Sequence, residues 1–349
     1  MTISNKSNKS NKSNKSNKST LGADLDHVGG ESSLSLSVAL DQMAVDLGLA
    51  VKPSASSGQV TTDAEMRLRK LDARHLRSIM MHDLLSGLSI DDAVGVPDAG
   101  PGVRVTVHSE QGEAVVIGWA YQGQSQLERQ LRSVADAKWI RDERLPEIIE
   151  QQTDLLSFHA LAMPMSGETH PWLGTLLEAC HGAAETVSAR VKFRLSAPRP
   201  ARLSPAINPV IQTPAHSASP SGHATEGFVL AYMLEALAFS GPNRALRAIA
   251  ERIAENRVVA GVHFPGDNAQ GQHLAVLLAR HFCAKIGVTP SIDQASGAIT
   301  LSQIPDTLSG LAALLPQDAP GWQSFVRPAP DPNGDDPLQT VTRLALAEV

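Results

Sequence analysis

The chain has 349 residues, of which 42% are hydrophobic and 19% are charged, and its formal net charge is −6 at pH 7. This composition predicts a globular protein with one main domain. A negative net charge excludes a general attraction to nucleic acid or to an anionic membrane, so a site for an anion must come from a local cluster of basic residues. The two cysteines, Cys180 and Cys283, indicate neither a disulfide framework nor a zinc site, and we expect two buried free thiols.

The N-terminal region is a low-complexity tract in which Ser-Asn-Lys repeats five times from Ser4 to Lys18. Such a repeat buries too little apolar surface to offset the entropy of ordering, so residues 1–61 are predicted to be disordered. The tract lacks the apolar stretch of a secretory signal, which favours a cytoplasmic protein. The most apolar run, Gly227–Phe239, is interrupted by Glu235. It is also shorter than the roughly 18 to 20 residues that cross a membrane, so no transmembrane segment is predicted.

Residues 62–315 are predicted to form one helical domain, because Ala, Leu, Glu and Arg dominate its segments and apolar residues recur at helical spacing. Residues 103–121 differ, because Val-Arg-Val-Thr-Val alternates, Gln-Gly-Glu turns and Ala-Val-Val-Ile-Gly-Trp follows, a pattern typical of a β-hairpin. Residues 316–349 are rich in Pro, Asp and Gly and are predicted to be a poorly ordered tail. Helices are expected, in chain order, at about 62–88, 125–160 with a break near Pro146, 171–195, 221–239, 243–260 and 266–286. The predicted fold class is all-α, a compact helical bundle with a small β-hairpin insertion and disordered termini.

Three short segments between residues 192 and 267 carry the chemistry. They are Lys192-x6-Arg199-Pro200, Pro220-Ser221-Gly222-His223 and Arg257-x3-Gly261-x-His263-x3-Asp267. Together they supply three cations, two imidazoles and one carboxylate. That set is sufficient to hold a tetrahedral oxyanion and to break one of its bonds.

The first two segments predict an anion cradle. Lys192 and Arg199 are seven residues apart, so they point the same way if the helix that is expected to end at residue 195 persists for another turn. The prolines on either side of Arg199 fix it on a stiff, extended stretch at a helix end. Ser221 is a natural N-cap, Gly222 lets the backbone approach a ligand, and His223 stands in the first turn of the next helix.

The third segment predicts a nucleophile. Arg257 and Gly261 share a helix face, and Gly261 ends that helix. His263 follows in the connection, and Asp267 lies four residues further on, where its carboxylate can accept the Nδ1 proton of His263. This arrangement fixes the tautomer and leaves Nε2 with a lone pair.

These segments resemble the signature of the superfamily of type 2 phosphatidic acid phosphatases, class A acid phosphatases and vanadium haloperoxidases. The resemblance covers residues 192–267 and, loosely, the surrounding helices. It departs at Asn256, where the family usually has Ser before the arginine.

The resemblance implies a metal-independent phosphatase that hydrolyses a phosphomonoester or small phosphoanhydride, needs no cofactor and has a small phosphorylated substrate as its partner. Lys192, Arg199 and Arg257 would clamp the phosphate oxygens, assisted by Ser221 and the Gly222 amide. His263, oriented by Asp267, would form a phosphohistidine. His223 would protonate the leaving group and then activate water. Gly261 and His216 would support the site from outside. The sequence does not specify an oligomeric state.

Other interpretations remain open at this stage. In the haloperoxidases the same groups hold vanadate as cofactor, the residue at His263 ligates vanadium, and bromide-oxidising members carry a histidine where His216 stands. Those enzymes have long insertions between the segments, whereas the spacing here is short, which favours the phosphatases. A helical domain that binds phosphate without turnover is a further alternative, but the two histidines argue against it. His263 and Asp267 as metal ligands, or Ser221 as a hydrolase nucleophile, are weaker hypotheses.

The remaining acidic and histidine residues are given structural roles. Glu226 and Glu235 are expected to face solvent or to be paired within the bundle. The other histidines, such as His159 and His181, are expected at surface positions or as satisfied core residues.

Overall fold

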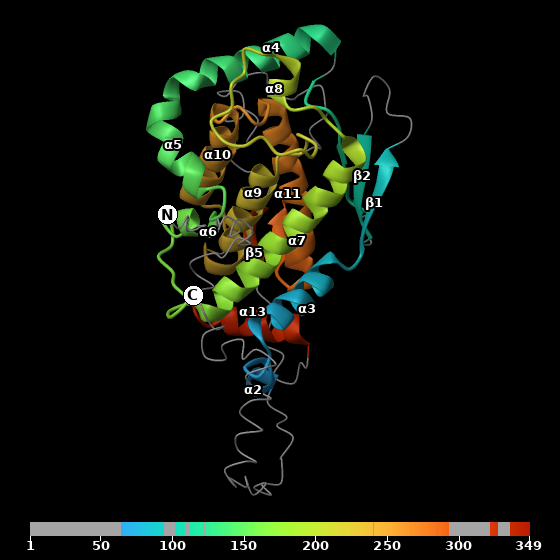
Figure 1. Cartoon of the computed structure of the whole chain (residues 1–349). Coiled ribbons are helices and arrows are strands. Elements are labelled where there is room, and N and C mark those ends of the chain that lie inside the picture. Colours follow the sequence, from blue (N-terminus) through green and yellow to red (C-terminus); the bar gives the residue numbers. More distant parts are fainter. Residues whose placement is uncertain are drawn as a thin grey trace, which may run out of the picture.

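The computed structural model describes residues 64–93, 102–108, 112–121, 123–239, 241–292, 322–326 and 336–349. It is mostly helical (Figure 1), which confirms the predicted fold class. The helices are α2 (Ala64–Leu68), α3 (Ala73–Leu85), α4 (Gly123–Asp136), the 3-10 helix η2 (Ala137–Ile140), α5 (Arg141–Glu150), α6 (Leu156–His159), α7 (Pro171–Leu195), α8 (Pro200–Leu203), α9 (Gly222–Leu234), the π-helical turn η3 (Glu235–Phe239), α10 (Arg244–Val259), α11 (Pro265–Lys285) and α13 (Pro337–Leu346). The predicted disorder of residues 1–61 lies outside the described residues. Among the helices that are described, none is long and apolar enough to span a bilayer.

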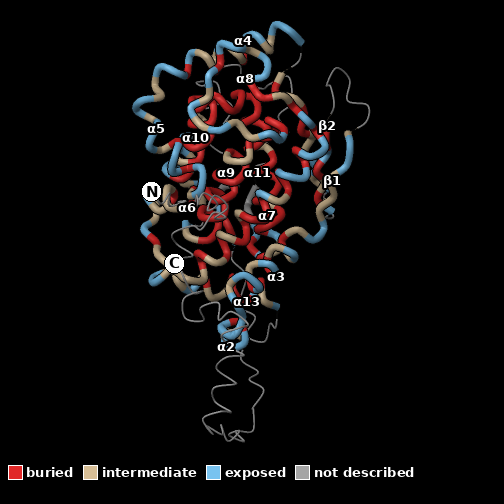
Figure 2. The backbone as a smooth tube through the Cα atoms, viewed as in Figure 1, coloured by how far each residue is buried: buried red, intermediate tan, exposed pale blue. Residues whose placement is uncertain are grey.

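Helix α9 is the centre of the bundle. It packs against α7, α10 and α11, and every residue from Ala224 to Leu234 is buried (Figure 2). A helix that is covered on all sides can be apolar around its whole circumference. The packing is closest at Gly271 on α11, where an added Cβ would lie only 2.6 Å from the carbonyl oxygen of Ser221. Glycine at this position therefore lets α11 press against the first turn of α9.

A small antiparallel sheet covers one flank of the bundle. Its strands β1 (Leu88–Ala93), β2 (Gly102–Val107) and β3 (Ala114–Ile117) are arranged in the order β1-β2-β3, and they contact α7 and α11. The alternating side chains of Val103, Val105 and Val107 are buried against these helices. The predicted hairpin is therefore present as β2 and β3. Strand β1 adds a third strand, and it begins at Leu88, where a helix was expected to end.

The C-terminal segment is part of the core. Helix α13 packs on α7 and α3, with Leu338 and Val341 buried, and Glu348 accepts hydrogen bonds from the backbone amides of Trp172 and Leu173 at the first turn of α7 (3.1 and 2.9 Å). The prediction of a poorly ordered tail is thus wrong for residues 337–346. Asp336 caps this helix and Pro337 starts it, and its apolar face finds a partner only in the tertiary structure. Strand β5 (Trp322–Val326) pairs with β4 (Thr289–Ile292), and the rest of the predicted tail up to residue 335 lies outside the described residues.

Two predicted helices are broken where the sequence analysis did not place a break. The helix expected at 62–88 is divided into α2 and α3, because Asp72 caps α3 by accepting from the amide of Arg74. The helix expected at 125–160 runs through Pro146, which lies inside α5. It is interrupted instead by the 3-10 helix η2 and again after Glu150. Pro146 is the sixth residue of α5, so it removes one backbone hydrogen bond of this helix without ending it.

Candidate active site

The three motif segments meet at the end of the bundle beneath α4 and α8, uppermost in Figure 1. The amide of Ser221 donates to the carbonyl of Asp267 (2.9 Å), which joins the second segment to the third. Arg199 Nη1 donates to the carbonyl of Val262 (2.8 Å), which joins the first segment to the third. The proposed site residues therefore lie in one region, although they are spread over the ends of four helices.

The loop before α9 holds the cations of the first segment. The carbonyl oxygen of Ser217 accepts from Lys192 Nζ (3.4 Å) and from Arg199 Nη2 (3.2 Å). Helix α7 ends at Leu195, because Ser196 adopts a left-handed conformation with φ of 50°. The helix does not persist to residue 199, contrary to the conditional prediction, and Arg199 is extended, as its flanking prolines indicate. A turn of the chain rather than one helix face brings the two cations together.

His263 is held in one tautomer. Its Nε2 lies 2.9 Å from Arg199 Nη1, and its Nδ1 lies 3.3 Å from Asp267 Oδ2. Because an arginine nitrogen can only donate, Nε2 must be the acceptor, and the ring proton must therefore be on Nδ1, facing the carboxylate. Burial, with repulsion from Arg199 and Lys192, lowers the pKa of His263 well below its ordinary value, so the ring is neutral. Burial raises the pKa of Asp267 to about 6, above which the carboxylate is ionised.

Arg257 is buried with two of its nitrogens unpaired. Its Nη2 donates to the carbonyl of Ile148 and to Gln151 Oε1 (both 3.2 Å), whereas Nε and Nη1 have no hydrogen-bond partner among the described residues. Unsatisfied donors on a buried cation raise the free energy of the folded protein. Donors that are already oriented in this way can bind an anion without rearrangement. Burial lowers the pKa of Arg257 to about 10, so the group stays charged at neutral pH.

His223 stands in the first turn of α9, facing α5. Its Nε2 lies 2.9 Å from the carbonyl oxygen of Gln151. Burial, followed by repulsion from Arg257, lowers the pKa of His223 to about 3. The ring is therefore neutral until negative charge arrives nearby to offset the arginine.

The start of α9 is built as the sequence predicts. Ser221 Oγ caps the helix by accepting from the amide of Ala224 (3.4 Å), and Gly222 follows as its first residue. An added Cβ at Gly222 would lie 3.1 Å from Glu226 Oε1. Ser219 Oγ, just before the cap, is buried and has no partner within the described chain. The amides and hydroxyls at this helix start add donors to those of the cations.

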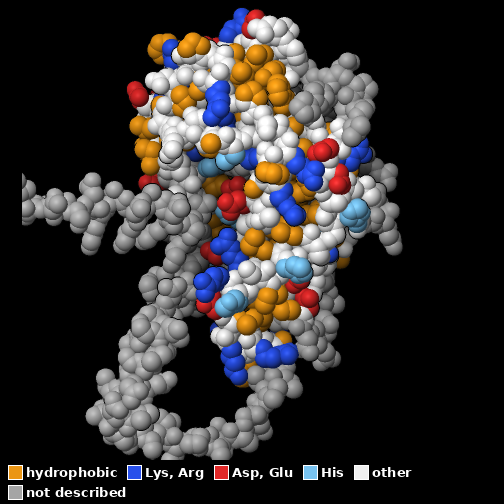
Figure 3. Space-filling view, turned by 45° about the vertical axis from the view of Figure 1, so that its right-hand side comes forward, with side chains coloured by type: hydrophobic (Ala, Val, Ile, Leu, Met, Phe, Trp, Pro, Cys, Tyr) orange, Lys and Arg blue, Asp and Glu red, His pale blue; other side chains and the backbone are white. Residues whose placement is uncertain are grey.

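The cationic cluster is electrostatically strained. Burial, followed by repulsion from Arg199, lowers the pKa of Lys192 to about 7, and burial lowers that of Arg199 to about 10. Since Asp267 and the more distant Glu226 are the carboxylates that oppose these shifts, the cluster carries excess positive charge. A bound dianion would relieve this repulsion. On the molecular face drawn in Figure 3, by contrast, basic and acidic side chains are interspersed. The positive charge of the site is a local cluster of the buried residues Lys192, Arg199 and Arg257.

His216 and Gly261, the two residues expected to support the site from outside, differ in their contacts. His216 Nδ1 lies 3.2 Å from Arg199 Nη2, so this histidine does border the site. Gly261 adopts φ of 83°, and a Cβ there would lie 2.9 Å from Arg141 Nη2. Arg141 itself donates to the carbonyl oxygens of Val259 and Asn208 (both 2.7 Å). Gly261 therefore ends α10 and leaves space for the arginine that anchors this loop.

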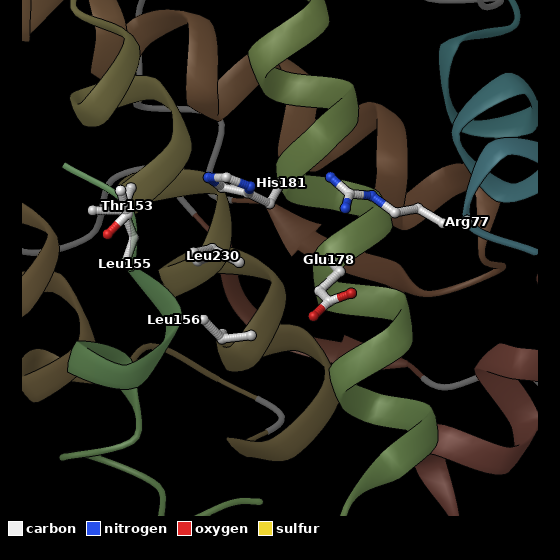
Figure 4. A pocket seen from close by; sticks show the side chains of 7 residues that line it. All are labelled: Arg77, Thr153, Leu155, Leu156, Glu178, His181 and Leu230. Atoms are coloured by element: carbon white, nitrogen blue, oxygen red, sulfur yellow. The ribbon is translucent and has the colours of Figure 1, made fainter. Parts of the chain in front are cut away.

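A largely buried ion pair lies one helical turn from the cradle. It agrees with the expectation that Glu226 faces solvent or is paired within the bundle, but its partner His181 was not predicted. Glu226 Oε2 is 3.2 Å from His181 Nε2. Although burial opposes both shifts, the hydrogen bond between the two groups raises the pKa of His181 and lowers that of Glu226. His181 also lines a pocket with Arg77, Glu178 and Leu230, where it points into the space between α7 and α9 (Figure 4). His181 lies eleven residues before Lys192, three helical turns, so helical spacing could have placed both on one face of α7.

Gln151 is the second residue that the sequence analysis missed. It follows α5 directly and contacts both His223 and Arg257. No local pattern indicates it, because the contacts span 72 and 106 residues of the chain. Gln151 also contacts Asn256, the residue that stands where the family usually has Ser. Asn256 Nδ2 donates to Gln151 Oε1 (3.0 Å) and to Glu147 Oε2 (2.8 Å).

A helical bundle with buried cations and two histidines around the start of its central helix defines a class of proteins that bind tetrahedral oxyanions. Residues 174–287 match the PAP2 superfamily, so the chain contains a PAP2 superfamily domain, with the phosphatase-like fold that this membership implies. This match confirms the resemblance drawn from the motifs. No curated protein matches the chain.

Proposed function

We propose that this protein hydrolyses a phosphomonoester or a small phosphoanhydride through a phosphohistidine formed on His263. The observation that carries the proposal is the tautomer of His263, whose Nε2 lone pair faces Arg199 while Nδ1 donates to Asp267. A neutral imidazole whose Nε2 carries a lone pair beside a cationic cluster can act as a nucleophile once Arg199 releases that lone pair. Binding of phosphate would require neither this tautomer nor a second histidine.

In the first step, His263 Nε2 attacks phosphorus and the bond from phosphorus to the leaving oxygen breaks. Arg199 now donates to Nε2, so it would turn from the nucleophile to the phosphate oxygens when substrate enters. Lys192 and the free nitrogens of Arg257 would offset the charge on the other oxygens. The negative charge of the substrate raises the pKa of His223 from its depressed value, so that His223 can carry the proton that the leaving oxygen accepts.

In the second step, a water molecule attacks the phosphohistidine. His223, now neutral, takes a proton from this water as the new bond to phosphorus forms, and the bond from phosphorus to His263 Nε2 breaks. Inorganic phosphate leaves and His263 regains its lone pair. His223, which holds the proton from water, releases it to solvent as its pKa falls again, so both histidines return to their starting state. One residue thus serves as acid and then as base, as a two-step transfer requires.

The test is a paired assay of one preparation. We expect hydrolysis of an aryl phosphate without added metal, inhibition by vanadate, and a phosphate adduct on the peptide that contains His263 after rapid quenching. An active protein with no such adduct would contradict the covalent mechanism.

The contact between His216 and Arg199 favours vanadate-dependent haloperoxidase activity as a second candidate. Vanadate is tetrahedral like phosphate, so the free donors of Arg257 and the lone pair of His263 would suit it equally. When bound, vanadate would supply the activation of peroxide. Activity towards bromide and peroxide that appears only after loading with vanadate would identify this function, whereas loss of phosphatase activity on the same addition identifies the first.

A further inference from the structure

Gln151 lies outside the segment that matches the PAP2 superfamily, yet it contacts two proposed functional groups. Its carbonyl oxygen accepts from His223 Nε2 (2.9 Å), and its side-chain Oε1 accepts from Arg257 Nη2 (3.2 Å). The residue is only 1% exposed. We propose that Gln151 is a positioning residue that orients the acid–base histidine and one cation of the phosphate clamp together. This inference rests on the function proposed above.

The orientation of the Gln151 amide follows from its neighbours. Arg144 can only donate, so the Asn256 atom that it contacts (3.0 Å) is Oδ1. Asn256 Nδ2 therefore faces Glu147 and Gln151, and the Gln151 atom that receives this donor must be Oε1. The same oxygen accepts from Arg257. The chain of donors thus fixes which end of the amide faces Arg257.

The effect on Arg257 is to tie down one nitrogen and leave the others free. Gln151 Oε1 and the carbonyl of Ile148 hold Nη2, so Nε and Nη1 remain as the unpaired donors. Gln151 Nε2 is also buried without a partner within the described part of the chain. Without Oε1 the guanidinium would rotate more freely, and an anion would have to order it on binding.

The effect on His223 is to fix its tautomer. A carbonyl oxygen can only accept, so the proton of neutral His223 is on Nε2. Nδ1 is then the nitrogen that gains and loses a proton during turnover. The main chain of Gln151 makes this contact, so a change of side chain separates the two roles.

The decisive variant is Gln151→Met, which keeps the length of the side chain and the backbone carbonyl but removes Oε1. We expect inorganic phosphate to bind about tenfold more weakly, because one hydrogen bond to a charged group is lost. KM for an aryl phosphate should rise by a similar factor, whereas kcat should change less than about threefold because the contact to His223 persists. The matched control is Gln152→Met, on the neighbouring exposed residue, which should leave phosphate binding unchanged.

A double-mutant cycle distinguishes positioning from a general structural effect. If Gln151 acts through Arg257, then Gln151→Met should not weaken phosphate binding further when Arg257 is already alanine. An equal loss in both backgrounds, or wild-type affinity in the single variant, would overturn the proposal. Should Gln151→Met fail to fold in urea titrations, Gln151→Asn keeps an amide but shortens the side chain by one methylene, which withdraws its oxygen from Arg257. Phosphate binding should again weaken, and only while Arg257 is present, so unchanged affinity would overturn the proposal in the same way.

Calorimetric titration with phosphate keeps this inference distinct from the proposed function. A wild-type protein that binds phosphate without hydrolysing aryl phosphates contradicts the proposed function, while the binding measurements on Gln151→Met still decide the role of Gln151. A wild-type protein that binds no phosphate overturns both.

Discussion

Buried charges lie at both ends of the central helix α9, but their environments differ. Beyond its C-terminus, Glu235 is fully buried, and its carboxylate accepts from Arg247 Nε (2.7 Å), Arg247 Nη2 (3.0 Å) and the amide of Asn243 (2.9 Å). Near its N-terminus, Arg257 is just as buried, yet its Nε and Nη1 have no partner in the described chain. The first arrangement is satisfied within the fold, and the second leaves donors unused.

This difference separates charges that are fully paired within the fold from charges that a bound anion could pair. A buried ion pair with its hydrogen bonds complete holds two elements together, and removal of one partner leaves an unpaired charge. A buried cation with free donors destabilises the folded protein until an anion binds. Burial alone therefore does not identify a site, and the unpaired nitrogens of a buried cation are what distinguish Arg257 from Glu235.

The largest expected effect is on turnover at the N-terminal end. His263→Ala removes the proposed nucleophile and should lower kcat for an aryl phosphate by about 10⁴-fold or more. The free energy of unfolding should fall by about 1 to 2 kcal/mol, because the buried ring also gives up its contacts to Arg199 and Asp267. Steady-state kinetics and urea unfolding measure both quantities. Turnover at the wild-type rate would show that another group attacks phosphorus.

Arg257→Met tests the idea that free donors cost stability. The change should lower kcat/KM by about 10²- to 10³-fold, because a clamp on the transition-state charge is lost. The free energy of unfolding should stay the same or rise by about 1 kcal/mol, because a buried charge with unpaired donors is replaced by an apolar side chain. A fall of several kcal/mol on urea unfolding would mean that Arg257 belongs with the structural charges.

Arg247→Met is the matched change at the other end of α9. It leaves the Glu235 carboxylate buried without its partner and should lower the free energy of unfolding by about 3 kcal/mol. The kcat of the folded fraction should equal that of the wild type. Loss of activity with unchanged stability would mean that Arg247 and Glu235 contribute to turnover. The charges at the two ends of α9 would then not differ in role.

The pKa of Lys192 predicts how anion binding depends on pH. Burial lowers this pKa to about 7, so Lys192 loses its proton as pH rises through that value and the site loses a positive charge. The affinity for sulfate, whose own charge is constant in this range, should therefore fall several-fold between about pH 6 and about pH 8. Calorimetry in two buffers of different ionisation enthalpy should also show proton uptake on binding near pH 7. Lys192→Met should bind weakly at both values, and a persistent pH dependence would assign the titration to another group.

The smallest effect is expected at Asn256. Asn256→Ser introduces the residue that the family usually has and removes the amide contacts to Glu147 and Gln151. We expect the free energy of unfolding to fall by about 1 kcal/mol and kcat/KM to change less than about threefold, because the contact acts only through a neighbour. A loss of activity as large as that of Arg257→Met would show that Asn256 itself contacts the substrate.

Helix boundaries set by local signals were predicted well. Helix α7 spans Pro171–Leu195 as expected, because proline occupies its first position. Helices α9 and α10 begin directly after Ser221 and Asn243, whose side chains accept from backbone amides of the first turn. These signals act between residues close in the chain, so they can be read without knowledge of the fold.

Elements that depend on distant partners were not predicted. Helix α13 gains its stability from packing on α7 and α3, and strand β1 from pairing with β2. Asp336 and Pro337 do give α13 a local start signal, but a short apolar helix or a single strand is stable only when its partner is present.

The sequence by itself indicated which residues are candidates for the proposed chemistry: the cations, the two histidines and the carboxylate of the three motifs, together with the caps that place them at helix ends. Only the tertiary structure decided which donors stay free, that Arg199 faces the lone pair of His263, and that Gln151 joins Arg257 to His223. The reason is that motif spacing encodes contacts within a few turns of a helix. Hydrogen bonds between segments far apart in the chain depend on how those helices pack.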